Sequence, residues 1–130
     1  MNLGHRELLL RPDYIHKYYQ ATFSAVDLTL DSAGVLGRLH EICKTAERVF
    51  LDLDCDVFDP AYFPATSQAR PLGLDPLFVL RVLNAIGNER LAGFAISEFE
   101  PSRDSHDRCL ETLMWLIEYV LLWKYEKMGS

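Results

Sequence analysis

The sequence predicts an α/β fold in which helices flank a parallel sheet. Two short apolar runs, residues 48–54 and 91–97, have the length and composition of buried strands. Longer runs with apolar residues three and four positions apart lie between and after them, as in helices. Strands that alternate with helices indicate a parallel sheet, because the helices serve as crossover connections. We therefore expect residues 1–130 to form a single α/β unit.

The first 46 residues are expected to contain two helices and one short strand. Pro12 suits the first turn of a helix that runs to Tyr19. An apolar strand is expected at residues 23–26. Asp31 or Ser32 can cap the second helix. The apolar residues expected on one face of this second helix are Leu36, Leu39, Cys43 and Ala46.

A long loop is expected after the strand at 48–54. Residues 57–74 contain three prolines and a glycine and lack helical or strand periodicity. Asp75 and Pro76 then form an N-cap and a first helical position, which predicts a helix over 77–86. The next strand is expected at 91–97, and a last helix at 104–125.

The composition excludes some classes of partner. The net charge of −6 argues against nucleic acid, because phosphate binding needs clustered Lys and Arg. Three cysteines without CxxC spacing are typical of reduced thiols, so we expect a cytoplasmic protein. The N-terminus does not have the pattern of a signal peptide. The longest apolar stretch, 113–123, contains Glu118 and is too short to span a bilayer, so no membrane is expected.

Acidic residues follow the strand at 48–54. Asp52, Asp54 and Asp56 would point the same way if that strand continued, because strand side chains alternate. Carboxylates held together repel one another, and a divalent metal such as Mn²⁺ or Mg²⁺ would balance their charge. The alternative is a strand end at which the aspartates are solvated. Glu98 ends the strand at 91–97 and would lie beside the first group, although alone it also fits a helix cap or a loop surface.

The spacing of these residues resembles the ureohydrolase family, which includes arginases and agmatinases. The similar segments read Asp54-x-Asp56-x-x-Asp59-Pro60, then Phe63-Pro64-Ala65-Thr66, Gly73-Leu74 and Glu98-x-x-Pro101. The opening Leu3-Gly4-His5-Arg6 is also similar to the Ile-Gly-x-Arg segment of the family. The resemblance covers essentially the whole chain and corresponds to the C-terminal half of the family's three-layer α/β/α fold.

The resemblance implies a role for each matched residue. Asp54 would bridge two Mn²⁺ ions, and Asp56 would bind one of them. Glu98 would hold the guanidinium or amidine group of a small-molecule substrate through a bidentate, charge-assisted pair. A water activated between the metals would attack the planar carbon and lead to hydrolysis of a linear C–N bond. Asp59 and Thr66 would support the loop.

Two departures separate this chain from the family pattern. Ser67-Gln68-Ala69 stands where the family commonly has Gly-Thr-Pro, which affects substrate recognition. The other metal ligands of the family lie upstream, in a His and an Asp-x-His-x-x-x-Asp-like cluster, and this sequence has no such segment. Two carboxylates cannot fill the coordination of two metals. We therefore expect the chain to be inactive alone and to need the missing N-terminal half or another chain.

Two other functions fit part of the pattern. A non-catalytic α/β interaction or assembly module could retain the acidic motif without turning over a substrate. A phosphate- or Mg²⁺-handling enzyme with a DxD site ranks last, because the chain has no Gly-rich phosphate loop. Trp115 and Leu122 lie on the otherwise polar stripe of the last helix, and parallel strands leave open edges. We therefore expect a homo-oligomer or a protein partner.

Overall fold

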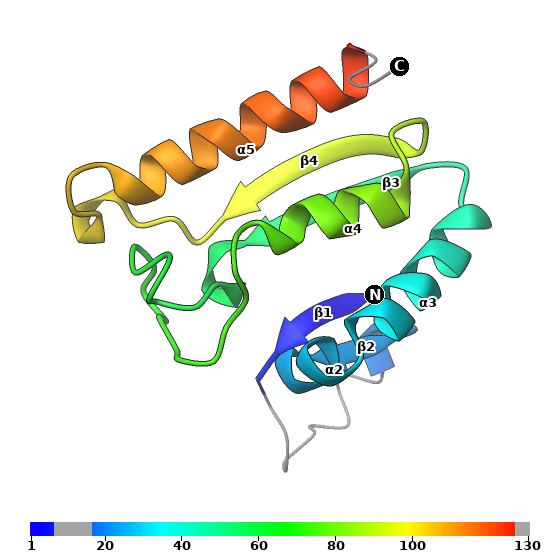
Figure 1. Ribbon diagram of the computed structural model, residues 1–130, viewed down its shortest axis with the longest axis horizontal. Coiled ribbons are helices and arrows are strands. Elements are labelled where there is room, and N and C mark those ends of the chain that lie inside the picture. Colours follow the sequence, from blue (N-terminus) through cyan, green and yellow to red (C-terminus); the bar gives the residue numbers. More distant parts are fainter. Residues whose placement is uncertain (7–16, 127–130) are drawn as a thin grey trace.

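The computed structural model describes residues 1–6 and 17–126 of the 130-residue chain (Figure 1). The strands are β1 (Asn2–His5), β2 (Thr22–Ser24), β3 (Val49–Asp54) and β4 (Leu91–Ser97). The α-helices are α2 (Ala25–Leu30), α3 (Ser32–Lys44), α4 (Phe78–Ile86) and α5 (Arg108–Tyr125), and the short 3₁₀ helices are η1 (Cys55–Val57) and η2 (Pro101–Arg103). β1 pairs with β2 and β3 pairs with β4, both in parallel. The predicted α/β class with parallel strands is confirmed.

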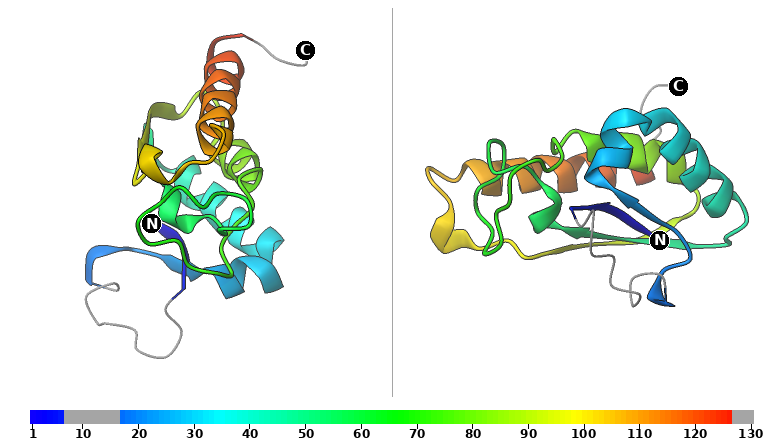
Figure 2. Two further views of the ribbon diagram at one scale, coloured as in Figure 1. Left: turned by 90° about the vertical axis from the view of Figure 1, so that its left-hand side faces the viewer. Right: turned by 90° about the horizontal axis from the view of Figure 1, so that it is seen from below.

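The β3–β4 sheet carries its helices on one face. α3, α4 and α5 all lie to one side of these two strands in both views of Figure 2. Leu51 and Leu53 of β3 pack against the core from this side. The alternate residues point to the opposite face, where Phe50 is 68% exposed and lies against Gly93 of β4. The second face of this small sheet is therefore open.

The core joins α4, α5, the sheet and the loop between β3 and α4. α4 buries five of its nine residues, which explains its nearly continuous apolar sequence. Phe58 and Phe63 of the loop are buried, with ring centroids 5.3 Å apart, and Phe63 also contacts Phe99 beyond β4 at 6.0 Å. Aromatic side chains thus hold the long loop against the ends of both strands.

Two helix ends are fixed by the residues at their termini. Asp31 is the N-cap of α3, and its carboxylate accepts a hydrogen bond from the Gly34 amide at 2.9 Å. Of the two caps considered, Asp31 is therefore the residue used. Gly87 ends α4 with a φ of 85°, a conformation that favours glycine.

Several predicted boundaries are wrong. The strand expected at 48–54 starts at Val49, and the second helix ends at Lys44, before Ala46. The strand expected at 23–26 ends at Ser24, because Ser24 and Asp27 form a capping box that starts α2. α4 starts at Phe78 rather than at residue 77, after Asp75 accepts a hydrogen bond from the Leu77 amide. The last helix starts at Arg108 rather than at residue 104.

The late start of α5 has a local cause. Asp104 accepts hydrogen bonds from the amides of Cys109 and Leu110, at 3.0 and 2.9 Å, and so caps the helix from outside it. His106 and Asp107 have positive φ, so the chain turns before the helix begins. Burial opposes ionisation of Asp104, but the hydrogen bonds from these amides outweigh it and lower the pKa of the carboxyl group.

β1 is a strand that the sequence pattern did not indicate. It has only four residues and contains Gly4 at a φ of 85°. Its pairing with β2 is therefore a tertiary contact rather than a local preference. The helix expected at 12–19 lies mostly outside the described residues. Among residues 1–6 and 17–126, no helix combines the length and the apolar character needed to cross a bilayer.

Two adjacent aromatic residues test the role of the loop in the core. Phe63 is fully buried, whereas Tyr62 is 58% exposed. Phe63→Ala should lower the free energy of unfolding by about 3–5 kcal/mol, because it removes a ring that contacts two others and leaves a cavity. Tyr62→Ala should change it by about 0.5 kcal/mol or less. Urea unfolding of both variants measures the difference, and equal effects would show that the loop is not part of the core.

Candidate functional site

The carboxyl ends of β3 and β4 meet at one rim that carries the predicted acidic residues. Asp54 is the last residue of β3, Asp56 lies in η1 directly after it, and Glu98 follows β4. All three line one cavity of about 400 Å³. The remaining lining residues are Asn2, Leu3, Gly4, His5, Arg6, Val57, Gln68 and Arg70. The structure therefore brings together the residues for which metal and substrate binding were expected.

A tight turn presents Asp54 and Asp56 to this cavity. The Asp54 carboxylate accepts a hydrogen bond from the Asp56 amide at 2.9 Å, which closes the first turn of η1. Cys55 between them is fully buried in the core. Burial, with the two flanking carboxylates, raises the pKa of the Cys55 thiol to about 12. Cys55 is therefore a neutral packing residue and not a thiolate ligand.

The acidic rim is electrostatically unfavourable without a counter-charge. Burial raises the pKa of Asp54, the Asp56 amide opposes this, and the carboxylates of Asp56 and Asp52 add to the rise. Asp52 does not line this cavity. The strand ends at Asp54, so the alternation that would align all three aspartates stops before Asp56, and Asp52 instead lies beside Ser97 at 3.4 Å.

Arg6 ties β1 to the acidic turn. Its guanidinium donates hydrogen bonds to three successive carbonyls, those of Asp56 at 2.7 Å, Val57 at 3.1 Å and Phe58 at 2.9 Å. Burial lowers the pKa of Arg6, while the nearby Asp59 carboxylate opposes that shift. Nη1 bonds the first of these carbonyls and Nη2 the other two, so the bonds use two separate nitrogens, whereas an ammonium group has one. Arg6 therefore holds the backbone that positions Asp56.

Sequence reasoning gives no role to Arg6 and predicts a loop or surface role for His5, although both belong to the Leu-Gly-His-Arg segment that carried part of the resemblance. His5 lines the cavity, and its Nδ1 is buried without a hydrogen-bond partner. The Oδ1 atom of Asp56 is also buried and unpaired. Buried polar atoms without a partner are uncommon and point to a group that is not part of the protein chain.

The loop that follows the turn is held by its own polar residues. Asp59 accepts hydrogen bonds from the Ala61 amide at 2.8 Å and the Gly73 amide at 3.1 Å. Any side chain at Gly73 would meet the backbone of Phe58 and Asp59, so a glycine is required at this close approach. Thr66 is buried, and its amide donates to the Pro64 carbonyl at 2.9 Å. The Glu100 amide donates a hydrogen bond to the Ala65 carbonyl at 2.9 Å, which joins the loop to the chain after β4.

The donor set fits a hard divalent cation in part. Asp54 and Asp56 offer carboxylate oxygens, which suit Mn²⁺ or Mg²⁺, and the unpaired Oδ1 of Asp56 is a free acceptor. Within the described residues, however, no three His, Cys, Asp or Glu side chains are grouped so that they could hold a metal ion. The described residues thus provide only part of a coordination sphere.

Comparison with known proteins finds one family. The sequence profile of the Arginase family matches residues 3–122. The chain is 31% identical over 93 residues to a formimidoylglutamase of Halobacterium salinarum, and 34% identical over 85 residues to a proclavaminate amidinohydrolase of Streptomyces clavuligerus. These matches cover 70% and 65% of this chain.

The same fold is present in solved structures. The agmatine ureohydrolase of Thermoplasma volcanium has a TM-score of 0.78 and 26% identity, and the match covers 100% of this chain. It covers 44% of that structure, and the matches to the two sequence relatives cover 30% and 27% of their lengths. The chain therefore spans less than half of the proteins that it matches.

Arg6→Lys tests whether the hydrogen bonds of Arg6 stabilise the turn that carries Asp54 and Asp56. A lysine has one nitrogen in place of Nη1 and Nη2, so it cannot occupy both of the donor positions that bond the carbonyls of residues 56–58. We expect a loss of about 1.5–3 kcal/mol in the free energy of unfolding, because partly buried carbonyls lose charged donors. Arg70→Lys is the control, since Arg70 is exposed. Chemical denaturation measures the stability of both variants. An Arg6→Lys variant as stable as the wild type would show that these hydrogen bonds do not stabilise the turn.

Asp59→Asn tests the loop by its dependence on pH. The amide of Ala61, more than that of Gly73, lowers the pKa of Asp59 below its ordinary value of 3.8. A carboxylate with a lowered folded-state pKa stabilises the fold above the unfolded-state pKa, and this contribution is lost as the pH falls through the folded-state value. The wild type should therefore melt higher than Asp59→Asn at pH 6, and the difference should vanish in strong acid. A difference in melting temperature that does not depend on pH would contradict this role of Asp59.

Proposed function

This chain belongs to the arginase family, and on that premise we propose that it contributes one part of the active site of a hydrolase that cleaves linear C–N bonds in guanidines or amidines. One observation carries the proposal. Asp54, Asp56 and Glu98 come from two neighbouring parallel strands and line the same cavity. In parallel α/β folds, ligands bind at the carboxyl ends of the strands. The relatives named amidinohydrolase and ureohydrolase support the substrate class.

Asp54 and Asp56 would hold Mn²⁺ at this rim, with two ions in the complete site. Bound Mn²⁺ would supply the Lewis acidity that activates a water molecule for hydrolysis. The raised pKa of Asp54 and the unpaired oxygen of Asp56 support a cation at this place. Arg6 keeps the Asp56 backbone in position, because it binds that carbonyl directly.

Glu98 would bind the substrate. Its carboxylate can accept two parallel N–H bonds from a planar guanidinium or amidine group. Glu98 has a φ of 62°, and this left-handed conformation turns the chain just after β4. The cavity is also lined by Gln68, from the segment that departs from the family pattern, and by Arg70, which follows that segment. These two side chains would distinguish substrates by the groups beyond the guanidinium.

The chain alone would be inactive, because its described residues supply only part of the metal coordination. We infer that residues 1–130 form one α/β unit that corresponds to the C-terminal half of the family fold. The remaining ligands would come from the other half. The cytoplasm and a homo-oligomeric state fit the free buried cysteines and the exposed apolar residues of α5, among them Trp115 at 47% exposure.

A second candidate function is a non-catalytic interaction module. The apolar exposure of α5 favours it, since Met114, Ile117 and Leu121 are also exposed on this helix. Metal binding distinguishes the two functions. A module that only assembles has no need for a cation at the acidic rim.

Titration with Mn²⁺, followed by electron paramagnetic resonance, tests the metal role. The isolated chain should bind Mn²⁺ weakly, because two carboxylates leave most coordination positions to water. Asp54→Asn and Asp56→Asn should each abolish this binding. Asp52→Asn is the matched control, because it removes the same charge from β3 outside the cavity. Binding that survives both site variants would favour the interaction module.

Assays of urea and ammonia release test the proposed inactivity. The chain alone should release neither product from guanidine or amidine substrates, at any Mn²⁺ concentration. Stoichiometric, tight binding of two Mn²⁺ ions by the chain alone, or measurable turnover, would contradict an incomplete site.

A further inference from the structure

We propose that Arg70 binds a carboxylate group at the end of the substrate remote from the guanidinium or amidine, so that the substrate is a guanidino or amidino acid. This inference rests on the proposed function, in which Glu98 holds the guanidinium or amidine group. It adds the charge at the other end of the substrate and names the residue that recognises it. Arg70 would determine specificity and would not act on the C–N bond that is cleaved.

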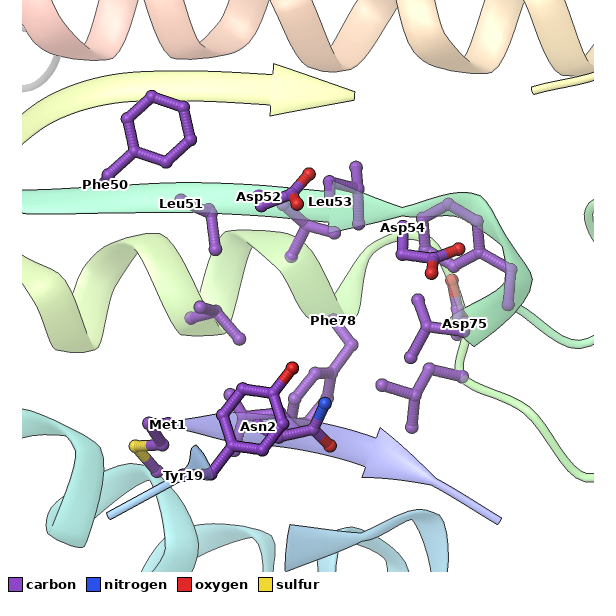
Figure 3. A pocket seen from close by; sticks show the side chains of 16 residues that line it. Met1, Asn2, Tyr19, Phe50, Leu51, Asp52, Leu53, Asp54, Asp75 and Phe78 are labelled. Atoms are coloured by element: carbon purple, nitrogen blue, oxygen red, sulfur yellow. The ribbon is translucent and has the colours of Figure 1, made fainter. Parts of the chain in front are cut away.

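The cavity at the acidic rim brings side chains of both charges together. β1 and β3 point the same way in Figure 3, and Asp54 lies at the carboxyl end of β3. The hydrogen bonds from Arg6 to the carbonyls of residues 56–58 hold the end of β1 at the same rim. Arg70 reaches this cavity from the loop that follows the turn. Cationic and anionic side chains from separate segments therefore line one space of about 400 Å³.

The loop holds the backbone of Arg70 beside the cavity. Pro71 favours an extended conformation of the residue before it. Leu72 has a φ of 63°, which is uncommon for a bulky residue and turns the chain. The Gly73 amide then donates a hydrogen bond to the Asp59 carboxylate at 3.1 Å. The backbone that follows Arg70 is therefore constrained, whereas its exposed side chain is free to meet a ligand in the cavity.

The carboxylates of the cavity do not form an ion pair with Arg70. Among the described residues, the only ion pair joins Arg103 and Glu100, outside this cavity. The Arg70 guanidinium donates one long hydrogen bond, at 3.4 Å, to the neutral side-chain oxygen of Gln68. A cation and several carboxylates thus line the same cavity without direct contact. The space between them suits a ligand that carries one charge of each sign.

Arg6 also lines this cavity, but its guanidinium is already engaged. Its Nη1 and Nη2 atoms donate to the carbonyls of residues 56–58. Burial lowers the pKa of Arg6, the Asp59 carboxylate opposes this shift, and the charge of Arg70 adds to it, so the two cations lie close enough to repel each other. An anionic ligand group beside Arg70 would reduce this repulsion. We therefore place the anion at Arg70 and not at Arg6.

A carboxylate is the anion that fits this cavity. Its two oxygens can accept parallel N–H bonds from the planar guanidinium of Arg70. Its single negative charge matches that of Arg70, whereas a phosphate dianion would bring a second negative charge close to Asp54, Asp56 and Glu98. The Nδ1 atom of His5, buried without a partner at the same cavity, is available for a further hydrogen bond to the ligand.

Ligand titrations followed by NMR test this specificity in the 130-residue chain without any need for turnover. The probes are ω-guanidino acids of increasing chain length, from 3-guanidinopropanoate to 6-guanidinohexanoate, each compared with its uncharged primary amide. Chemical shifts of the backbone amides of residues 54–57 and 68–70 report binding at the cavity. For the chain length that binds best, the acid should bind roughly fivefold or more tightly than its amide, which is the scale of a partly hydrated ion pair.

Variants of Arg70 assign the preference to its charge. Arg70→Gln should bind acid and amide equally, and Arg70→Glu should prefer the amide. Arg38→Gln is the matched control, because it removes the same charge from an exposed position of α3 outside the cavity, and it should keep the wild-type preference. The proposal is overturned if the wild type does not prefer the acid, if the preference survives Arg70→Gln, or if no acid binds at the cavity.

Glu98→Gln separates this inference from the proposed function. It should weaken the binding of both the acid and the amide by a similar factor, because both carry the guanidinium group, and it should leave the preference for the acid in place. Binding of the amide that does not depend on Glu98 would contradict the proposed function. Binding that depends on Glu98 but not on Arg70 would overturn the carboxylate site alone.

Discussion

The bonds from Arg6 to three successive backbone carbonyls are the interaction on which the site depends. They connect β1, at the start of the chain, with the turn after β3 that carries Asp56. No pairing between strands makes this connection among the described residues, because the two sheets are separate. Arg6 also lies against Gly73, so the same guanidinium contacts the far end of the loop. The position of the turn that carries Asp56 therefore depends on one partly buried cation.

The clustered carboxylates at the ends of β3 and β4 are electrostatically unfavourable in the chain alone. Asp54 is partly desolvated beside two other carboxylates, and its pKa is raised for that reason. Buried Asp56 Oδ1 and His5 Nδ1 atoms lack partners at the same cavity. Sites of this kind gain stability from the ligand that they bind. On the proposed function, a cation and further ligands would complete this rim.

Much of the fold could be predicted from local patterns. The β4 strand and the end of α4 at Gly87 follow from apolar runs and a glycine stop, which are local signals. The proximity of Asp54 and Glu98 could be predicted because the carboxyl ends of neighbouring parallel strands lie at the same edge of a sheet. β1 could not be predicted, because four residues with a glycine carry no strand pattern and depend on β2 for pairing. The start of α2 was missed because Ser24 serves as a cap inside an apolar run, and the role of Arg6 was missed because its partners are carbonyls 50 to 52 positions away.

The central claim is that this chain supplies Asp54 and Asp56 to a metal site completed by another segment. A crystal structure of the chain bound to a complementary arginase-family segment, grown with Mn²⁺ and measured at the manganese absorption edge, tests it most directly. The account predicts anomalous peaks within coordination distance, about 2.0–2.3 Å, of carboxylate oxygens of both aspartates, with the remaining ligands from the other segment. Peaks distant from Asp54 and Asp56, or a complex without manganese at this rim, would contradict it.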